Sequence, residues 1–416
     1  MSHKTFHLTL LSQAVASVLL AVAPAVHAAG FNAAVTGGKF KGVLRPRFEY
    51  VDQENISKTS KALTLRGAFQ YTTGAWQGLQ LRSELEVVGA LGADNYNSTQ
   101  NGKTMYPLVA DPMGGHFNRL FLFHKGGAYE VGAGMDEIIY DNSRWVGNVG
   151  WRQNHQTFNS VKIDGQAGGI SYHAAYLFSR YHVANVGGAY NGDAYYDGDD
   201  FHSSYFLNAG YGFSFGRLVG FAYSYKFDQP NGNTVNRTNT LGGSLSGTPG
   251  PFEYRLEYAT QKREDAKGAG RDGTASYWHL VGGMKFGAAR LLLGYEFLGS
   301  DDGQYAVKAD FGTNHKFNGF ADQFLSTPDA GLKDLYVTGV YRFAGNKFVA
   351  SYHRFTPDYD RTFDKYGDEV DLVAVKKLNK QVSLLAKYAD YKADAVTGNP
   401  KANDVQKLIV QAEYHF

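Results

Sequence analysis

The chain has 416 residues, with 41 Lys and Arg against 39 Asp and Glu, so its formal net charge is only +2. This near balance argues against a nucleic-acid partner, because nucleic-acid-binding proteins carry a basic surface. The absence of cysteine excludes disulfides and thiolate metal sites. Fifty Gly and 15% aromatic residues accompany a mean hydropathy of -0.35. This combination is typical of a membrane β-barrel, in which only alternate strand residues meet lipid.

The first predicted element is a secretory signal peptide at residues 1–28. Lys4 precedes an apolar core at 14–26, and the segment ends on the small residue Ala28. We expect cleavage after Ala28, which leaves residues 29–416 as a single domain. No later apolar run reaches the ~18 residues that a transmembrane helix requires.

Short segments of alternating apolar and polar residues follow, separated in turn by tight Gly-rich connections and by long loops rich in Asp, Asn and Gly. They predict about 18 strands, at 43–51, 62–71, 79–88, 117–125, 129–138, 157–164, 170–181, 202–214, 217–226, 238–245, 252–261, 275–286, 289–298, 334–343, 348–355, 369–376, 382–392 and 405–416. The expected fold is all-β, a transmembrane antiparallel up-and-down β-barrel. Its long loops would be extracellular, and its short turns and both termini would be periplasmic. A soluble β-sandwich or propeller is the alternative, but we find no repeat of fixed period.

Two loop motifs suggest other chemistry. Residues 268–273 match a dinucleotide-binding pattern, but they lie in a charged loop that no helix follows. The acidic segment 191–200 could chelate a divalent cation, but its spacing fits no standard calcium loop. No catalytic motif is present, so we predict no enzymatic activity, no cofactor and no metal. An outer-membrane hydrolase and a surface adhesin remain as less favoured alternatives.

The last nine residues show the clearest alternation in the chain. One face carries Leu408, Val410, Ala412, Tyr414 and Phe416, and Gln411, Glu413 and His415 lie on the other. A terminal aromatic residue on such a strand resembles the closing strand of bacterial outer-membrane barrels. We therefore expect contact with lipid and lipopolysaccharide, and recognition by the barrel-assembly machinery through this strand.

Charged residues share one face of the early strands. They are Arg45, Arg47 and Glu49 in the first predicted strand, Arg66 in the second, and Arg82, Glu84 and Glu86 in the third. We expect them to face inward, because Arg or Lys facing mid-bilayer lipid costs about 2–4 kcal/mol. They either form cross-strand ion-pair ladders or line a channel that 18 strands would leave open. The four arginines favour an anionic solute, although the neighbouring glutamates, and Asp136 further on, oppose this charge.

Residues 144–158 read Arg-Trp-Val-Gly-Asn-Val-Gly-Trp-Arg-Gln-Asn-His-Gln-Thr-Phe, which resembles a signature of the alginate-export family of outer-membrane barrels. Residues 45–52 and 315–322 extend the resemblance. It implies an 18-stranded barrel with an electropositive channel that passes an acidic polysaccharide to the exterior. In this interpretation Arg144 and Arg152 meet the solute at a constriction, where Asn148, Asn154 and Gln156 would hydrogen-bond sugar hydroxyls. Alternatively, this segment merely packs a long loop against the barrel rim.

Together these features predict a passive outer-membrane channel of a Gram-negative bacterium for hydrophilic, anionic, carbohydrate-like solutes. The alternative is a general or nutrient-uptake porin that passes small hydrophilic solutes.

Overall fold

The computed structural model describes residues 28–184, 199–226, 237–264, 272–359 and 362–416. The predicted signal peptide, apart from its last residue, and most of the acidic segment 191–200 lie outside the described residues. Both therefore stay predictions. The dinucleotide-like motif also falls outside, except for its last two residues, and Gly273 begins a strand.

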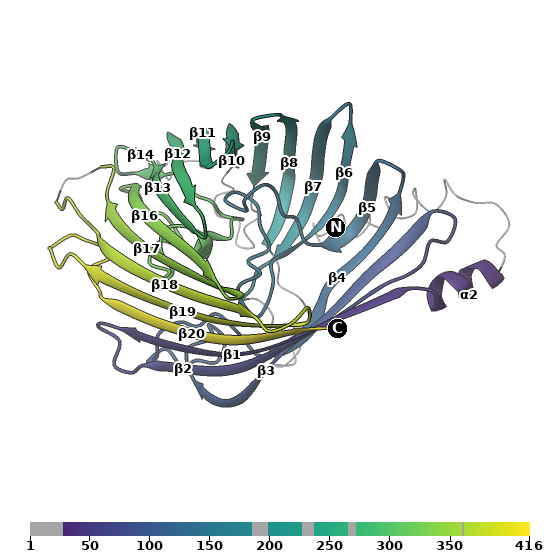
Figure 1. Cartoon of the computed structure of the whole chain (residues 1–416), viewed down its shortest axis with the longest axis horizontal. Helices are drawn as coiled ribbons and strands as arrows, with labels where there is room; N and C mark the ends of the chain where they lie inside the picture. The colour runs from purple at the N-terminus through teal and green to yellow at the C-terminus, as the bar shows by residue number, and fades with distance from the viewer. Residues whose placement is uncertain (1–27, 185–198, 227–236, 265–271, 360–361) are drawn as a thin grey trace, which may run out of the picture.

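Eighteen strands form one antiparallel sheet among the described residues (Figure 1). They are β1 (Lys39–Gln53), β2 (Ser60–Thr72), β3 (Leu79–Asn95), β4 (Gly114–Lys125), β5 (Tyr129–Asp136), β6 (Thr157–Ala167), β7 (Ile170–Tyr181), β8 (Asp199–Phe213), β9 (Gly216–Lys226), β10 (Arg237–Gly247), β11 (Phe252–Glu264), β12 (Gly273–Phe286), β13 (Ala289–Leu298), β16 (Leu332–Phe343), β17 (Asn346–Thr356), β18 (Gly367–Lys377), β19 (Val382–Ala393) and β20 (Val405–His415). Each pairs with its neighbours in chain order, and β1 pairs with both β2 and β20, which closes the barrel. The predicted fold class and its strand segments are confirmed.

The other elements are small. Helix α2 (Ala28–Thr36), which the sequence did not predict, packs on the β2–β3 turn, where the backbone nitrogen of Gly74 donates to the carbonyl of Ala34 at 2.8 Å. A 3₁₀ turn η1 (Asn314–Lys316) and the short strands β14 (Ser300–Asp301) and β15 (Tyr305–Ala306) lie in the loop before β16. Within the described residues, no helix is long and apolar enough to cross a membrane.

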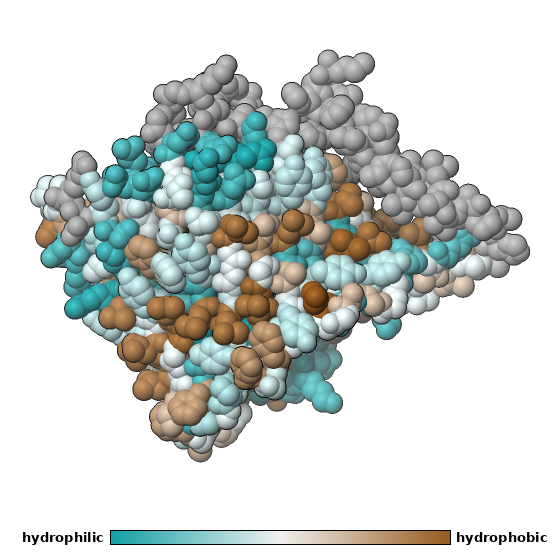
Figure 2. Space-filling model, turned by 90° about the horizontal axis from the view of Figure 1, so that it is seen from above, coloured by the Kyte–Doolittle hydropathy of each residue, from teal (hydrophilic) through white to brown (hydrophobic). Residues whose placement is uncertain are grey.

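The two faces of the wall differ as the alternation predicts. On β20, the outward Val410 is 47% exposed, whereas the inward Lys407 is 4% exposed. Large apolar side chains are likewise exposed on the outer face of the other strands, and Figure 2 shows hydrophobic residues gathered in a band on the face in view. A closed sheet with this outer face satisfies every strand hydrogen bond while it presents hydrocarbon to lipid.

The long loops fold back into the barrel instead of only projecting from it. Val146 forms a parallel bridge with Phe311, which joins the loop after β5 to the loop before β16. The Phe311 ring packs on Phe158, Phe206 and Tyr225, all from the inner face of the wall. Because these apolar loop residues are buried against the wall, the loops fill part of the lumen (Figure 1).

Candidate functional site

Two loop segments meet inside the barrel and together form what we call the plug, residues 144–156 and 311–322. The amide of Gln156 donates to the carbonyls of Gly147, at 2.7 Å, and Phe311, at 3.0 Å. Further along, the rings of Trp151 and His315 stack at 3.4 Å between centroids. The two segments therefore behave as one unit across the lumen.

The first segment of the plug offers consecutive carbonyl groups to the arginines of β1. Arg45 donates to the carbonyl of Gly150 at 2.9 Å and to that of Arg152 at 2.8 Å, and Arg47 donates to the carbonyl of Trp151. Arg47 also donates to the side chain of Gln411 on β20. The predicted lumen arginines of β1 thus hold the plug as well as facing the interior.

Arg152, predicted at a constriction, is 4% exposed and lies between two carboxylates. Its guanidinium donates to Glu49 at 2.6 Å and to Asp111 at 2.9 Å. Burial alone would raise the pKa of Asp111, but Arg152 and Arg47 more than offset it and hold that pKa below its usual range. The carboxylate is therefore charged at neutral pH and its pairing fixes the loop.

Arg144, the other predicted constriction arginine, is 2% exposed and anchors the plug to a different wall. It pairs with Glu296 of β13 at 2.8 Å and donates to Asn318 of the second plug segment at 3.1 Å. Asn318 in turn donates to Glu296 and to Asp334 of β16. The two arginines therefore lie on different walls, and solute contact by either stays a prediction.

The polar residues predicted beside them make contacts typical of a packed loop. Asn154 donates to the carbonyl of Pro112 at 3.1 Å. Asn148 accepts from the backbone nitrogen of Gly150 at 3.1 Å. Trp145, buried nearby, donates to Glu257 of β11 at 2.7 Å. These contacts explain why the segment combines Trp, Asn and Gln without any requirement for a sugar.

The remaining predicted lumen residues form ion pairs along β2 to β5. Arg66 pairs with Glu86 at 2.5 Å, and Arg82 pairs with Asp136 at 2.7 Å. Glu84 accepts from the side chain of Asn118 at 2.8 Å. These pairs are the cross-strand ladder that the sequence left open as one interpretation.

Arg119 belongs to this wall, but strict alternation missed it. A register shift between β3 and β4 pairs Glu84 with Arg119 and Leu85 with Phe117, so one residue of β4 is extra at this point. The bulge puts Arg119 on the inner face, where it pairs with Glu137 at 2.5 Å. The two adjacent polar residues Asn118 and Arg119 between apolar runs were the signal that could have indicated it.

Two cavities lie on either side of the plug backbone. One, of about 330 Å³, opens toward the β-turn end and includes Gly150 in its lining. The other, of about 270 Å³, opens toward the loop end and includes Val149, Trp151 and Arg152. Because neighbouring plug residues line both cavities, the plug lies between them.

The turn-end cavity carries more positive than negative charge. Its lining has four cationic and two acidic side chains, which are Lys41, Arg45, Arg66 and Arg119 against Glu84 and Glu413. Among the three arginines of this lining, Arg45 is the least neutralised, because its nearest carboxylate, Glu413, lies 3.9 Å away and its Nε atom has no hydrogen-bond partner. The fork geometry of arginine suits a carboxylate ligand.

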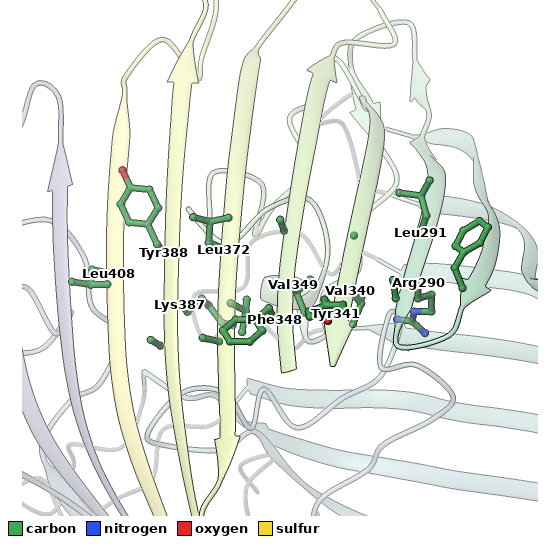
Figure 3. Close-up of a pocket in the computed structure, with 17 residues that line it drawn as sticks. Arg290, Leu291, Val340, Tyr341, Phe348, Val349, Leu372, Lys387, Tyr388 and Leu408 are labelled. Atoms are coloured by element: carbon green, nitrogen blue, oxygen red, sulfur yellow. The ribbon is translucent and has the colours of Figure 1, made fainter. Parts of the chain in front are cut away.

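A larger hollow, of about 740 Å³, lies on the outer face of β13 and β16 to β20 (Figure 3). Its walls include the lipid-facing side chains of Leu291, Tyr341, Phe348 and Leu372. An apolar hollow at this place suits hydrocarbon and not a hydrophilic solute. In the described part of the chain, no group of three or more His, Asp or Glu side chains is arranged to hold a metal ion.

No protein-family model and no curated protein matches this sequence. Solved structures do match its fold. OccAB2 of Acinetobacter baumannii is 14% identical with a TM-score of 0.66, covering 92% of this chain and 99% of that one. OccK9 (OpdG) of Pseudomonas aeruginosa is 15% identical with a TM-score of 0.65 and the same coverage. OpdK of P. aeruginosa, solved with vanillate, is 14% identical with a TM-score of 0.64, again at 92% and 99%.

These neighbours correct the family prediction. The neighbours named above are Occ/Opd substrate-specific outer-membrane porins, and they are not alginate-export proteins, so the resemblance drawn from residues 144–158 is wrong. The reason is physical, because the Arg, Trp, Asn and Gln of that segment pack a loop inside the barrel. Such packing requires no particular solute. At 12–15% identity the likeness establishes the fold alone, a closed antiparallel β-barrel of 18 strands.

Proposed function

We propose that this protein is a passive porin of the outer membrane that admits small organic anions by diffusion. The observation that carries the proposal is the turn-end cavity of about 330 Å³, with its excess of cationic side chains beside the plug. A cavity of this size suits a small solute. Selection would come from the charge of the wall and from the loops folded inside it.

The plug also argues against the passage of a polymer. It ties the wall at β1 to the wall at β13 through Arg152 and Arg144, and both pairs are buried. A polysaccharide would have to displace these pairs, and leaving their partners unpaired costs about 3–5 kcal/mol each. The nutrient-uptake porin is therefore the function that we propose, and export of a polysaccharide is not part of it.

A carboxylate is the anion that the site suits best. Arginine guanidinium groups bind carboxylates in a bidentate manner, and the cavity lining includes the partly exposed Arg119 and the exposed Lys41. OpdK, one of the structural neighbours, was solved with vanillate, an aromatic carboxylate. By analogy we propose small carboxylates as solutes, with no cofactor and no catalytic step.

The placement in the cell follows from the same proposal. We place the short turns, helix α2 and both ends of the mature chain in the periplasm, and the loop ends outside. The outward apolar face would contact lipid and lipopolysaccharide, and β20 would be recognised by the assembly machinery.

Planar-bilayer recordings on the purified protein test the function. We expect an open channel whose reversal potential in a salt gradient shows anion preference, and whose current is reduced by small carboxylates. Liposome uptake should favour small carboxylates over oligouronates. A cation-selective channel, or equal uptake of oligouronates, would overturn the proposal.

A further inference from the structure

One part of the inner face of the barrel wall is apolar and partly exposed. In the turn-end half of the barrel, β16 to β19 direct five aliphatic side chains inward, and we call them the valine patch. The patch consists of Val340, Val349, Val373, Val375 and Leu385.

The inward direction of these side chains follows from strand parity. Asp334, His353 and Asp371 lie an even number of residues from the patch members on their own strands and are buried inside the barrel. Asp371 accepts the backbone nitrogen of Phe320 in the plug at 3.2 Å, which fixes its side as the interior. The pairings from β16 to β19 run without a register shift, so the same parity holds down to the turns.

The patch is continuous across four strands. Val340 pairs directly with Val349, and Val349 with Val373, while Val375 pairs with Leu385 on β19. Side chains opposite each other in such pairs lie about 5 Å apart, so they form one surface. Val340 is buried, and the other four side chains are partly exposed.

A cluster of cations borders this patch on its turn side. Arg290 of β13 is paired in register with Val340. Arg342 and Lys347 are paired with each other, and each lies two residues closer to the β16–β17 turn than Val340 and Val349 do. Arg290 forms an ion pair with Glu253 at 3.0 Å. In the described part of the chain, no carboxylate lies within ion-pair distance of Arg342 or Lys347. Of Arg290, Arg342 and Lys347, only Arg290 therefore has a carboxylate as its ion-pair partner among the described residues.

We infer that the valine patch and its cationic border form a subsite for amphiphilic carboxylates, separate from the arginine wall of β1 to β4. The hydrocarbon body of the solute lies on the patch, and its carboxylate lies at Arg342 and Lys347. This inference rests on the proposed porin function and adds the solute class that the channel prefers. The apolar surface is what distinguishes it, because chloride and acetate gain nothing from a valine wall.

A homologous series of carboxylates tests the subsite. The current through single channels is measured with acetate, butyrate, hexanoate and octanoate, and the half-blocking concentration is compared. Burial of one methylene against the patch should tighten block by roughly twofold, which is less than the value for full burial because one side stays wet. We expect a steady gain along the series for the unmodified channel.

The variant V349T V373T keeps the shape of both side chains and replaces a methyl by a hydroxyl at each. It should flatten the dependence on chain length while leaving chloride conductance and block by acetate unchanged. V281T, at a half-buried inward valine of β12 outside the patch, is the matched control and should retain the dependence. R342Q K347Q should weaken block by all members longer than acetate. Folding of each variant is checked by heat-modifiable migration in gels.

The outcomes separate the two proposals. A cation-selective unmodified channel refutes the porin for anions and the subsite with it. An anion-selective channel without chain-length dependence refutes the subsite alone. The subsite is also refuted if V349T V373T keeps the dependence, or if V281T removes it equally.

Discussion

Trp151 and His315 stack with their ring centroids 3.4 Å apart and their planes 11° from parallel, which joins the two plug segments. Burial lowers the pKa of His315 well below its usual range, although Asp322 opposes this effect. The neutral ring then donates from Nδ1 to Asp322 at 2.5 Å and accepts from Lys387 at 2.8 Å through Nε2. Hydrogen bonds at both ring nitrogens therefore fix the orientation of His315 in the stack.

Replacing Trp151 by Ala should loosen the plug. The loss of the stack and of partial burial costs roughly 1–3 kcal/mol locally, which should raise single-channel conductance and open-channel noise. Trp278→Ala removes a lipid-facing Trp from β12 and serves as the control, which should keep the normal conductance. Equal conductance in both variants would contradict the role of the stack.

Arg152→Gln should loosen the first plug segment, residues 144–156, more than Trp151→Ala does. It removes the closer of the two cations beside the buried carboxylates of Glu49 and Asp111 and leaves only Arg47, 3.8–4.0 Å away. Breaking such a buried pair costs up to about 3–5 kcal/mol. We expect a wider channel and faster proteolysis within residues 144–156. Lys262→Gln breaks an ion pair whose two side chains are exposed and should change neither property.

The charge of the turn-end cavity predicts its selectivity. Arg45→Gln should lower the anion-to-cation permeability ratio, measured from the reversal potential in a salt gradient. The ratio of the unmodified channel should fall as the Debye length shrinks from about 30 Å at 0.01 M to about 3 Å at 1 M salt. Arg82→Gln should have less effect, because Arg82 is not part of the cavity lining and pairs with Asp136 and Glu130. A larger fall in the permeability ratio for Arg82→Gln than for Arg45→Gln would show that charges outside the turn-end cavity determine the ion selectivity.

Acid should release the first plug segment. The pKa of Asp111 is lower in the folded protein than in the unfolded chain, so its stabilising effect is fully present above about pH 4, the ordinary value for Asp. It is lost as the pH falls below that value through the lowered pKa. Open-channel noise should therefore rise below about pH 4. In Asp111→Asn the noise should be high already at pH 7 and should change less with acid.

The alternation of the final strand predicts that lysine at position 410 impairs assembly more than lysine at position 411. Val410→Lys places a charge on the lipid face of β20, at a cost of about 2–4 kcal/mol, and should reduce assembly into the membrane. Gln411→Lys points inward and should assemble at nearly the normal level, although it removes the acceptor of Arg47. Heat-modifiable migration of membrane fractions measures both. Equal assembly would contradict the assigned faces.

The sequence alone was sufficient for the barrel wall. Strand positions and faces follow from the alternation of apolar and polar residues. Each residue of a wall strand meets either lipid or the interior, and its own polarity indicates which of the two it meets. Leu408, Val410 and Tyr414 on the outer face of β20 show this directly. The inward charges of β1 to β3 follow from the same rule.

The tertiary structure alone decided what lies inside the wall. Arg152 meets Glu49, and Arg144 meets Glu296, through contacts between segments far apart in the chain, which no local pattern encodes. The inward turn of Arg119 depends on a bulge, and one extra residue reverses the parity from which faces are read. The neutralisation of an arginine is likewise a property of its three-dimensional neighbours. Charge type could be read from the sequence, but the charges left free to meet a solute could only be identified once the loops had folded into the lumen.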